Sequence, residues 1–503
     1  MKLANCLRAF APISLSTLIA AQQRLSPTGF KGCDALIAAG LGDMLVFPAD
    51  LGYRESTSLY YSSENRRLQP YCIVQPVSTE DVSRSVKALG AVSSAGNWDI
   101  AVRSGGHSDF DNNAAHRGVT IDLTFLNSTT ILGVIGGNAT ATWTGSSKLT
   151  KHVAQIQPAA RWGNVMSTLE PFNLGVTGGR SGHVGAGGLL VSGGASYHTQ
   201  LWGLSCDNVI GYEVVLGDGS IVTASNTENA DLFKALKGGG NNLGIVTRFD
   251  MRTFTVPSGG AYGGLLFTSW SDLDAVNDQF VKYASSIEQG SPDHEFVVYR
   301  SDAGSLSIMA MAVATDGDEN SANFEVFDRL NLTRDMRARR PLSQIAASIA
   351  DTGGSYYIPF TLTLQPTRLD EASVPVSVNF VFQPLPKLLH SVTPGSNVLG
   401  FDENLPSDSI LFEARGALAA EDALFHGIAR AEMAKSVEGL RAYSASLDAH
   451  STYLYMNYAN PEQDVLGSCG EEKAAFLRRV AIKYDPSSFF QRRVSGGWKI
   501  SRV

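Results

Sequence analysis

The chain has 503 residues, of which 44% are hydrophobic and 17% are charged. This length exceeds one ordinary core, so two or three lobes are expected. The composition excludes an intrinsically disordered protein, and the formal net charge of −8 argues against a nucleic-acid-binding surface.

The first 21 residues have the pattern of an export signal peptide. Lys2 and Arg8 supply positive charge, residues 9–19 are largely apolar, and Ala20 or Ala21 offers a small residue for cleavage. A poorly packed tail is the alternative. No later run is long enough to span a bilayer, so we expect a secreted protein without a membrane partner.

The cysteines fit an exported protein, because removal of Cys6 with the signal leaves an even set of four. We predict a disulfide between Cys33 and Cys72, which flank an N-terminal segment (22–65) with little else to hold it. Cys206 and Cys469 lie in different regions and are alternatively free core thiols. Three glycosylation sequons, which also arise by chance, stand at Asn127, Asn138 and Asn331.

Residues 66–257 alternate strand and helix patterns, as expected of an α+β lobe. A helix is predicted to begin at Ser78 to Asp81, because apolar residues follow at helical spacing at Val82, Val86 and Leu89. The strands are expected at 71–75, 100–103, 118–122, 208–216 and 220–224.

Residues 258–440 alternate apolar strands with helices, which predicts a second α+β lobe. The expected strands are 263–268, 295–300, 305–313, 356–364 and 376–382. In the last of these, Val376, Val378, Phe380 and Phe382 share one face, and Ser377, Asn379, Val381 and Gln383 share the other. The polar face could line a site or simply be solvated.

The C-terminal segment, 441–503, contains another alternating stretch, YLYMNYANPEQDV. As a strand it would turn Tyr453, Tyr455 and Asn457 one way and Leu454, Met456 and Tyr458 the other. Two phenols and an amide on one face are a candidate site. Tyrosine is also common in half-buried strands, so packing is the alternative.

Two glycine-rich segments suggest a site for a large flat cofactor such as a flavin. The first, Arg103-Ser104-Gly105-Gly106-His107, follows a predicted strand and fixes a histidine beside two glycines. The second, GGRSGHVGAGGLLVSGG, has eight glycines in the seventeen positions 178–194, which lets its backbone approach a bound molecule.

Several other sites are excluded by spacing. The glycines do not match G-x-G-x-x-G between a strand and a helix, and no Lys-Ser/Thr follows them as in a P-loop. The nine histidines lack the pairing of a zinc site, and no G-x-S-x-G elbow is present. We therefore predict no metal at His107 or His183.

Ordered blocks over nearly the whole mature length resemble one family. They are PYCIVQPVSTEDV, RSGGH, GVTIDLTFLN, GHVGAGGLLVSGG, LWGLSCDNVIGYEVVLGDG, DLFKALKGGGNNLGIVTRF, YMNYANPEQDVLGS and YDPSSFFQRRVSGGWKIS. Together they are similar to the FAD-linked oxidases of the berberine bridge enzyme-like group, within the vanillyl-alcohol oxidase (PCMH-type) superfamily. Some segments look more like those of fungal secondary-metabolite members.

The resemblance implies an α+β fold with a two-lobed FAD-binding domain (66–257), an inserted substrate domain (258–440) and a returning C-terminal segment. It also implies a covalent bond between His107 and the flavin. Members with two covalent links carry a cysteine where this chain has Ser181, and a serine hydroxyl lacks thiolate nucleophilicity. Attachment through His107 alone is therefore expected.

The same resemblance assigns site residues. Tyr455 is the expected base, although a free phenol titrates near pH 10 and the site would have to favour phenolate or concerted proton transfer. Gln383, with Asn379, would orient substrate, and Val184 aligns with an oxygen-gate position or simply packs. His183 neighbours the flavin or packs in its loop. The expected cofactor-binding residues are Arg103, Ser104, Gly105, Gly106, His107, Ser108, Gly179, Ser181, Gly182, His183, Val184, Gly185, Gly188, Ile245 and Asn457.

The expected function is oxidation of a small-molecule alcohol, amine or cyclisable precursor, with dioxygen as acceptor and hydrogen peroxide as product. A secreted carbohydrate oxidase is the alternative substrate class. A flavin-binding surface protein with little turnover is the alternative of another kind, and retention of both His107 and Tyr455 argues against it.

Overall fold

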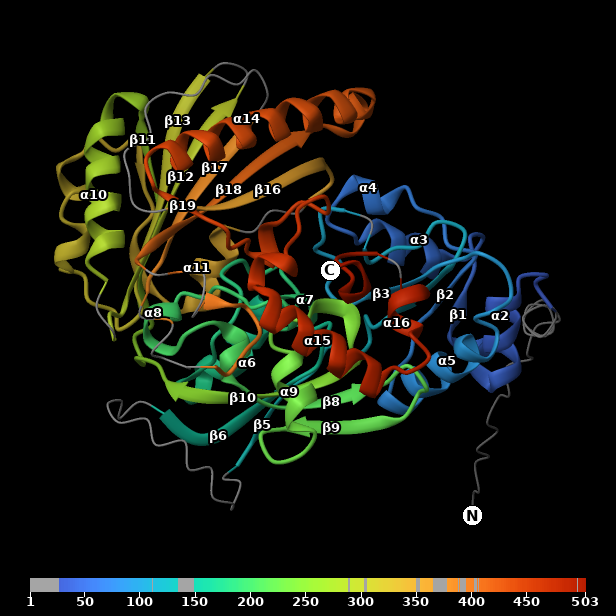
Figure 1. The fold of residues 1–503 in the computed structure, drawn as a ribbon. Helices are drawn as coiled ribbons and strands as arrows, with labels where there is room; N and C mark the ends of the chain where they lie inside the picture. The colour runs from blue at the N-terminus through green and yellow to red at the C-terminus, as the bar shows by residue number, and fades with distance from the viewer. Residues whose placement is uncertain are drawn as a thin grey trace, which may run out of the picture.

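The computed structural model describes residues 27–110, 112–133, 149–287, 290–302, 305–349, 353–364, 378–387, 389, 395–401, 405, 407–494 and 496–503. The expected signal peptide, Asn138, Val376 and Ser377 lie outside these residues. The described chain forms three sheets with helices around them (Figure 1), which confirms the α+β class.

The first sheet has the order β1-β2-β4-β3 and holds the strand that precedes His107. Its strands are β1 (Leu45–Val46), β2 (Cys72–Val74), β3 (Ile100–Arg103) and β4 (Val119–Asp122). Helix α5 (Thr79–Ala91) begins after Ser78, whose hydroxyl accepts a hydrogen bond from the Asp81 amide, as predicted. The predicted disulfide joins Cys72 to Cys33 on α2 (Lys31–Leu36).

The second sheet is antiparallel, with the order β5-β6-β10-β8-β9, and β7 also pairs with β10. Its strands are β5 (Thr129–Leu132), β6 (Leu149–Ile156), β7 (Leu174–Gly175), β8 (Val209–Val215), β9 (Ile221–Ser225) and β10 (Ile245–Thr255). Leu477 and Val480 of the C-terminal helix α15 (Glu471–Tyr484) belong to the same hydrophobic core as Phe249 and Met251 of β10. The end of the chain therefore packs against the N-terminal half (Figure 1).

The third sheet has nine strands, in the order β14-β11-β13-β12-β17-β18-β16-β19, and β15 also pairs with β11. Their bounds are β11 (Ala261–Ser269), β12 (Asp293–Asp302), β13 (Ser305–Ala314), β14 (Arg334–Asp335), β15 (Ala338–Arg340), β16 (Tyr356–Leu364), β17 (Val378–Leu385), β18 (Ser409–Leu418) and β19 (His450–Ser451). Helices α10 (Leu273–Ser285) and α14 (His426–Ser446) cover its outer face (Figure 1). Its inner face meets α11 (Leu342–Ser348) and the N-terminal half.

Shorter helices connect these layers. They are α3 (Leu51–Ser58), α4 (Ser63–Arg66), α6 (Trp162–Leu169), α7 (Ala186–Val191), α8 (Thr199–Trp202), α9 (Ala230–Ala235) and α16 (Phe489–Arg492). The predicted strands are present within a few residues of their expected bounds, with one exception. The domain limits remain predictions.

The exception is the predicted strand at Tyr453 to Tyr458, which is wrong. This segment is extended only as far as Tyr455 and then turns into a short 3-10 helix, Met456–Tyr458. The side chain of Asn460 donates to the Pro359 carbonyl, which fixes the segment by a side-chain contact rather than by strand pairing. The alternation therefore breaks, and the Tyr458 ring lies edge-on to Tyr455 with their centroids 5.0 Å apart.

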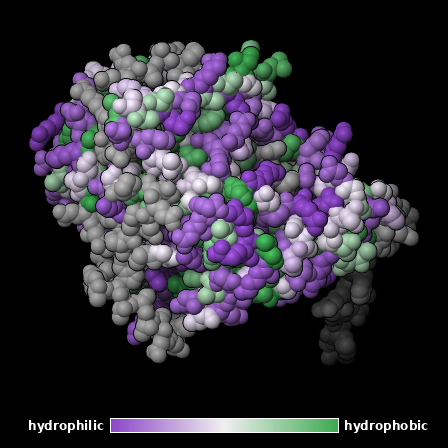
Figure 2. Space-filling model, in the orientation of Figure 1, coloured by the Kyte–Doolittle hydropathy of each residue, from purple (hydrophilic) through white to green (hydrophobic). Residues whose placement is uncertain are grey.

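The visible surface in Figure 2 is largely hydrophilic, with scattered apolar side chains. Within the described residues, no helix is both long and apolar enough to cross a bilayer. The described part of the chain also contains no cluster of three His, Cys, Asp or Glu side chains suited to a metal ion.

Candidate active site

A cavity of about 510 Å³ lies where the loop after β3, the glycine-rich segment and the inner face of the third sheet meet. Residues from all three parts line it, together with the segment around Tyr455. The predicted site residues on its wall are Ser104, Gly105, Gly106, His107, Ser108, Gly179, Ser181, Val184, Gly185, Gly188, Asn379, Tyr455 and Asn457. Most of the predicted site is therefore brought together in one place.

The two glycine segments touch each other directly at the cavity. A Cβ added to Gly105 would lie 2.5 Å from the Cα of Gly185, and the reverse addition would clash equally. Gly106 has φ +66°, a conformation that residues with side chains rarely adopt. Glycine at these positions is therefore needed for the close approach of two backbones and for the turn that delivers His107.

His107 begins a stack of rings at the cavity wall. Its imidazole lies 4.0 Å from the Tyr61 ring, and Tyr61 lies 4.4 Å from Tyr357. The Arg415 guanidinium sits 5.1 Å and 4.7 Å from these two tyrosine rings and forms a 2.6 Å ion pair with Asp109. The histidine is thus held between the N-terminal half and the third sheet.

Two features of the cavity wall fit a flavin cofactor: backbone that is not covered by side chains, and polar atoms that have no hydrogen-bond partner within the described residues. An added Cβ at Gly188 would meet no heavy atom within 4 Å, so the wall is open there. The Oδ1 atoms of Asn112 and Asn113 are buried without a hydrogen-bond partner, and both residues line the cavity. Buried acceptors of this kind require donors, which a bound flavin nucleotide would supply.

Some predicted cofactor-binding side chains are not on the cavity wall. The buried Arg103 guanidinium is engaged by Asp122 at 3.2 Å and by the Ser56 carbonyl at 2.7 Å. Ile245 is buried in the core beneath the first sheet. These two side chains therefore support the loop and the sheet rather than face the site.

Three further predicted residues also lie off the wall. Gly182 donates its amide to the Ala346 carbonyl, and His183 is exposed. Gln383 is buried one step behind the cavity, where its Oε1 accepts a 3.4 Å hydrogen bond from the Tyr458 hydroxyl. This geometry therefore does not favour a direct contact between Gln383 and the substrate.

Tyr455 lines the cavity, but its surroundings do not favour the phenolate that a base would need. The hydroxyl accepts a 2.6 Å hydrogen bond from the Ala195 amide, and the residue is 2% exposed. Burial raises the pKa of Tyr455 well above its ordinary value, and this effect exceeds the lowering by the amide and by Arg180. Of the two ways in which Tyr455 could act as a base, the raised pKa disfavours the phenolate and leaves concerted proton transfer.

Glu413 is a candidate functional residue that the sequence analysis missed. It lies on β18, lines the cavity and is 6% exposed. Burial raises the pKa of its carboxyl to about 7, although Arg415 and Arg180 lower it. Such a carboxyl can accept a proton at neutral pH. A carboxyl between apolar residues in SILFEARGAL was the available signal, because ionisable groups are seldom buried in strands.

Arg180 forms a hydrogen bond with Tyr458 and lowers the pKa of the Glu413 carboxyl through its charge. Its guanidinium donates to the Tyr458 hydroxyl and lies 3.2 Å from Nε2 of the buried His294. Its cationic carbon also sits 4.9 Å from the Phe296 ring centroid. The cavity thus combines a carboxyl of near-neutral pKa with fixed cations.

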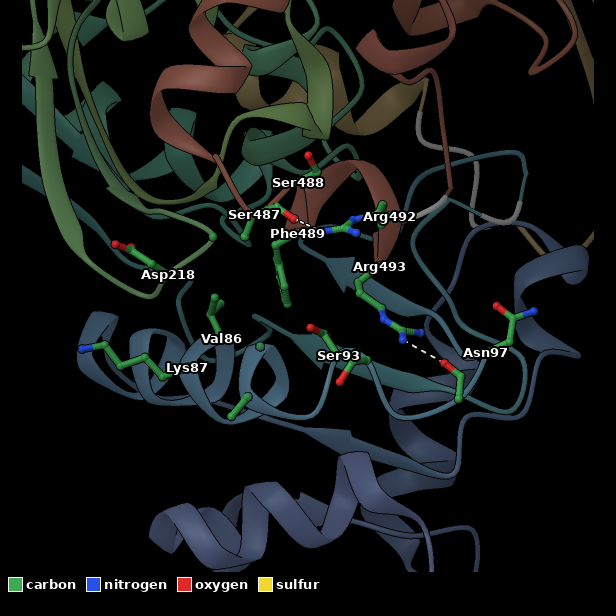
Figure 3. Close-up of a pocket in the computed structure, with 15 residues that line it drawn as sticks. Val86, Lys87, Ser93, Asn97, Asp218, Ser487, Ser488, Phe489, Arg492 and Arg493 are labelled. Carbon is green, nitrogen blue, oxygen red and sulfur yellow. Dashed lines mark hydrogen bonds between the residues drawn. The ribbon is translucent and has the colours of Figure 1, made fainter.

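A second hollow of about 680 Å³ lies between α5 and α16 (Figure 3). Both arginines that line it are engaged by backbone: Arg493 donates to the Trp98 and Gly96 carbonyls, and Arg492 donates to the Ser487 carbonyl. None of the predicted site residues lines this hollow. The cavity at His107 is therefore the candidate active site.

Comparison with known proteins agrees with this geometry. Residues 70–225 match the model of a FAD-binding domain. The chain is 32% identical to the FAD-dependent monooxygenase sdcF of Emericella nidulans over 94% of this chain and 98% of that protein. It is also 32% identical to the FAD-dependent monooxygenase drtC of Aspergillus calidoustus, over 94% and 90% of the two chains. The chain belongs to this family of FAD-dependent oxidoreductases.

Solved structures support the fold of a FAD-dependent oxidoreductase of the berberine bridge enzyme type. A berberine bridge enzyme variant in complex with (S)-reticuline matches with a TM-score of 0.71 at 16% identity, over 93% of this chain and 99% of that chain. Xylooligosaccharide oxidase from Myceliophthora thermophila matches with a TM-score of 0.69 at 20% identity, over 92% and 98%. These matches confirm the fold that the resemblance implied, and the matched FAD-binding domain together with the FAD-dependent relatives shows that FAD is the cofactor.

Proposed function

We propose that this protein is a FAD-dependent oxidase of a small-molecule alcohol, amine or cyclisable secondary-metabolite precursor. The observation that carries the proposal is the buried carboxyl of Glu413, of pKa about 7, on the wall of the cavity that also holds His107. When bound, FAD accepts a hydride from the substrate carbon and passes the electrons to dioxygen, giving hydrogen peroxide.

The proton of the substrate's hydroxyl or amine goes to the ionised Glu413 carboxylate as the neighbouring carbon loses its hydride. The product is then a carbonyl or an imine, and the protonated Glu413 returns its proton to solvent after release. Because the Tyr455 hydroxyl accepts from the Ala195 amide, its own proton is free to be donated. Tyr455 is therefore assigned to binding the substrate oxygen, with Glu413 as the base.

His107 is proposed as the only covalent anchor of FAD. The backbone turn at Gly106 and the stack with Tyr61 support this role, because they hold the imidazole at the cavity wall. Ser181 lines the same cavity where a second anchor would require a thiolate.

The test is whether purified protein is yellow and is bleached by substrate without oxygen. Acid precipitation should leave the flavin on the wild type and release it from His107→Ala. Flavin that stays attached to His107→Ala would refute the single link. A protein that binds no flavin would refute the whole proposal.

Monooxygenation is the second candidate, because curated relatives sdcF and drtC are named FAD-dependent monooxygenases. The two candidates differ in the fate of dioxygen. Oxidation gives peroxide in step with product, whereas monooxygenation places one oxygen atom from labelled dioxygen in the product. Mass spectrometry of the product under labelled dioxygen distinguishes them.

We also propose that the mature protein is secreted after cleavage near Ala21. The disulfide between Cys33 and Cys72 supports this, since disulfides persist mainly in oxidising compartments. The exposed sequons at Asn127 and Asn331 are accessible to glycosylation. N-terminal sequencing of protein from culture medium tests the proposal.

A further inference from the structure

The inner face of the third sheet presents two rows of side chains to the cavity, set by strand register. In one row, Val298 pairs with Val381, and Val381 pairs with Glu413. In the next row, Arg300 pairs with Asn379, and Asn379 pairs with Arg415. All six residues line the cavity. The sheet therefore places a polar row of arginine, amide and arginine beside the row that contains the carboxyl.

The charges in these rows do not cancel. The Arg415 guanidinium is held by Asp109 at 2.6 Å, and Arg180 acts on Glu413 and Tyr458. The Arg300 guanidinium, in contrast, has no hydrogen-bond or ion-pair partner in the part of the chain that the structure describes. Asp302, the next residue on that face, is exposed and lies outside the cavity lining. A protein of net charge −8 thus keeps an uncompensated cation on its cavity wall.

Sheet geometry sets the separation between this cation and the carboxyl. Arg300 and Glu413 are two strands and two residues apart, so their Cα atoms are roughly 10 to 12 Å apart. Both side chains extend into the cavity and shorten that gap. A ligand of one or two rings can span it, with one end at Arg300 and the other at Glu413.

We infer that the substrate carries a carboxylate and that Arg300 binds it, with the Asn379 amide beside the pair. This inference rests on the proposed oxidase function, because it assigns the reacting end of the substrate to Glu413. A guanidinium is suited to the role, since it binds a carboxylate through two parallel hydrogen bonds. Arg300 is accordingly a specificity-determining residue.

The experiment uses the flavin absorption of the holoenzyme to follow binding of benzoate, 2-naphthoate and the two matching neutral amides. We expect saturable binding of the acids. Arg300→Gln should weaken their affinity by roughly 10- to 100-fold, and Arg300→Lys should lose less. Arg329→Gln is the matched control, because it removes the same charge from an exposed site, where the Arg329 guanidinium pairs with Glu325. Amide binding should be equal in all four proteins.

Three results overturn the inference. The first is acid binding that Arg300→Gln leaves unchanged, and the second is no saturable binding of either acid to the wild type. The third is loss of flavin from Arg300→Gln, which would show that the arginine holds the cofactor. A wild-type protein that contains no flavin is a separate result, and it overturns the proposed function itself.

Discussion

The two walls of the cavity are built in different ways. The wall that carries His107 is made of backbone, and its shape depends on glycines at positions where a Cβ has no room, such as Gly105 and Gly185. The wall formed by the third sheet is made of side chains, and its chemistry depends on which residues neighbouring strands place side by side, such as Asn379 and Arg415. In the function proposed above, the first wall holds the cofactor, and the second selects and deprotonates the substrate.

This difference predicts two kinds of failure. A change in the backbone wall should damage folding and cofactor binding together, because two chain segments share the contact. A change in the sheet wall should leave the flavin in place and alter turnover, because charged groups there act on the ligand. Variants in each wall test this division.

Gly105→Ala should have the largest effect. Its new Cβ would lie 2.5 Å from the Gly185 Cα and 2.7 Å from the Gly185 nitrogen, so the two segments must separate. We expect a loss of about 3 kcal/mol or more in the free energy of unfolding. Thermal unfolding and the ratio of flavin to protein absorbance measure both consequences.

Two further glycines provide matched controls. Gly439→Ala adds a methyl group on α14 with no heavy atom within 4 Å, so flavin content should stay at the wild-type level and stability should rise by no more than about 1 kcal/mol. Gly188→Ala also meets no protein atom but points into the cavity wall, so it should fold normally and bind less flavin. A Gly105→Ala protein with normal stability and full flavin would contradict the role of the backbone contact.

Glu413→Gln should have the next largest effect, and it acts on chemistry alone. Removal of the base should slow flavin reduction by about 100- to 10 000-fold and leave the visible spectrum intact. In the wild type, reduction should speed up as pH rises through about 7, because the carboxyl must be ionised to accept a proton. Stopped-flow reduction without oxygen should show that this rise is absent from the variant.

Tyr455→Phe is the comparison for Glu413→Gln. It removes only a hydrogen bond to the substrate oxygen, so the variant should keep the pH dependence and lose less rate. If Tyr455→Phe abolishes reduction while Glu413→Gln stays within a few-fold of wild type, the base is Tyr455, as the sequence alone indicated.

The same division explains what could be predicted from the sequence. Local patterns identified the helix after Ser78, the disulfide partners Cys33 and Cys72, and the glycine wall around His107. These features depend on spacing within a short segment, or on residue types such as cysteine and glycine that have few structural roles. The polar face of Asn379 was also visible, because alternation within one strand defines it.

Features set by long-range pairing could not be obtained in this way. Glu413 lies opposite Val381 only because β17 and β18 align in one register, and no local pattern states that register. Tyr61 meets His107 across the chain for the same reason. The alternating pattern around Tyr455 predicted a strand that is absent, because the hydrogen bond from the Asn460 side chain to the Pro359 carbonyl fixes the segment in another conformation.

Glu295 tests whether the pKa of Glu413 is a property of the cavity or of burial in this sheet. It lies on β12 but belongs to the opposite face, and it is 0% exposed. Burial raises its pKa to about 8, more than the neighbouring Gln279 lowers it. This folded pKa exceeds that of an unfolded glutamate, so protonation of Glu295 stabilises the fold. The stabilisation is fully present below about pH 4.5 and is lost as pH rises through about 8.

Glu295→Gln keeps a neutral side chain at every pH, so it should remove this loss of stability. We expect the variant to match the wild type at about pH 4 and to exceed it at about pH 9 by on the order of 5 kcal/mol. Urea unfolding at about pH 4 and about pH 9 measures the difference, and flavin reduction should be unchanged. Equal pH dependence in both proteins would show that Glu295 is ionised in the fold. In that case burial alone does not raise a carboxyl pKa in this sheet, and the near-neutral pKa of Glu413 would have to be measured directly.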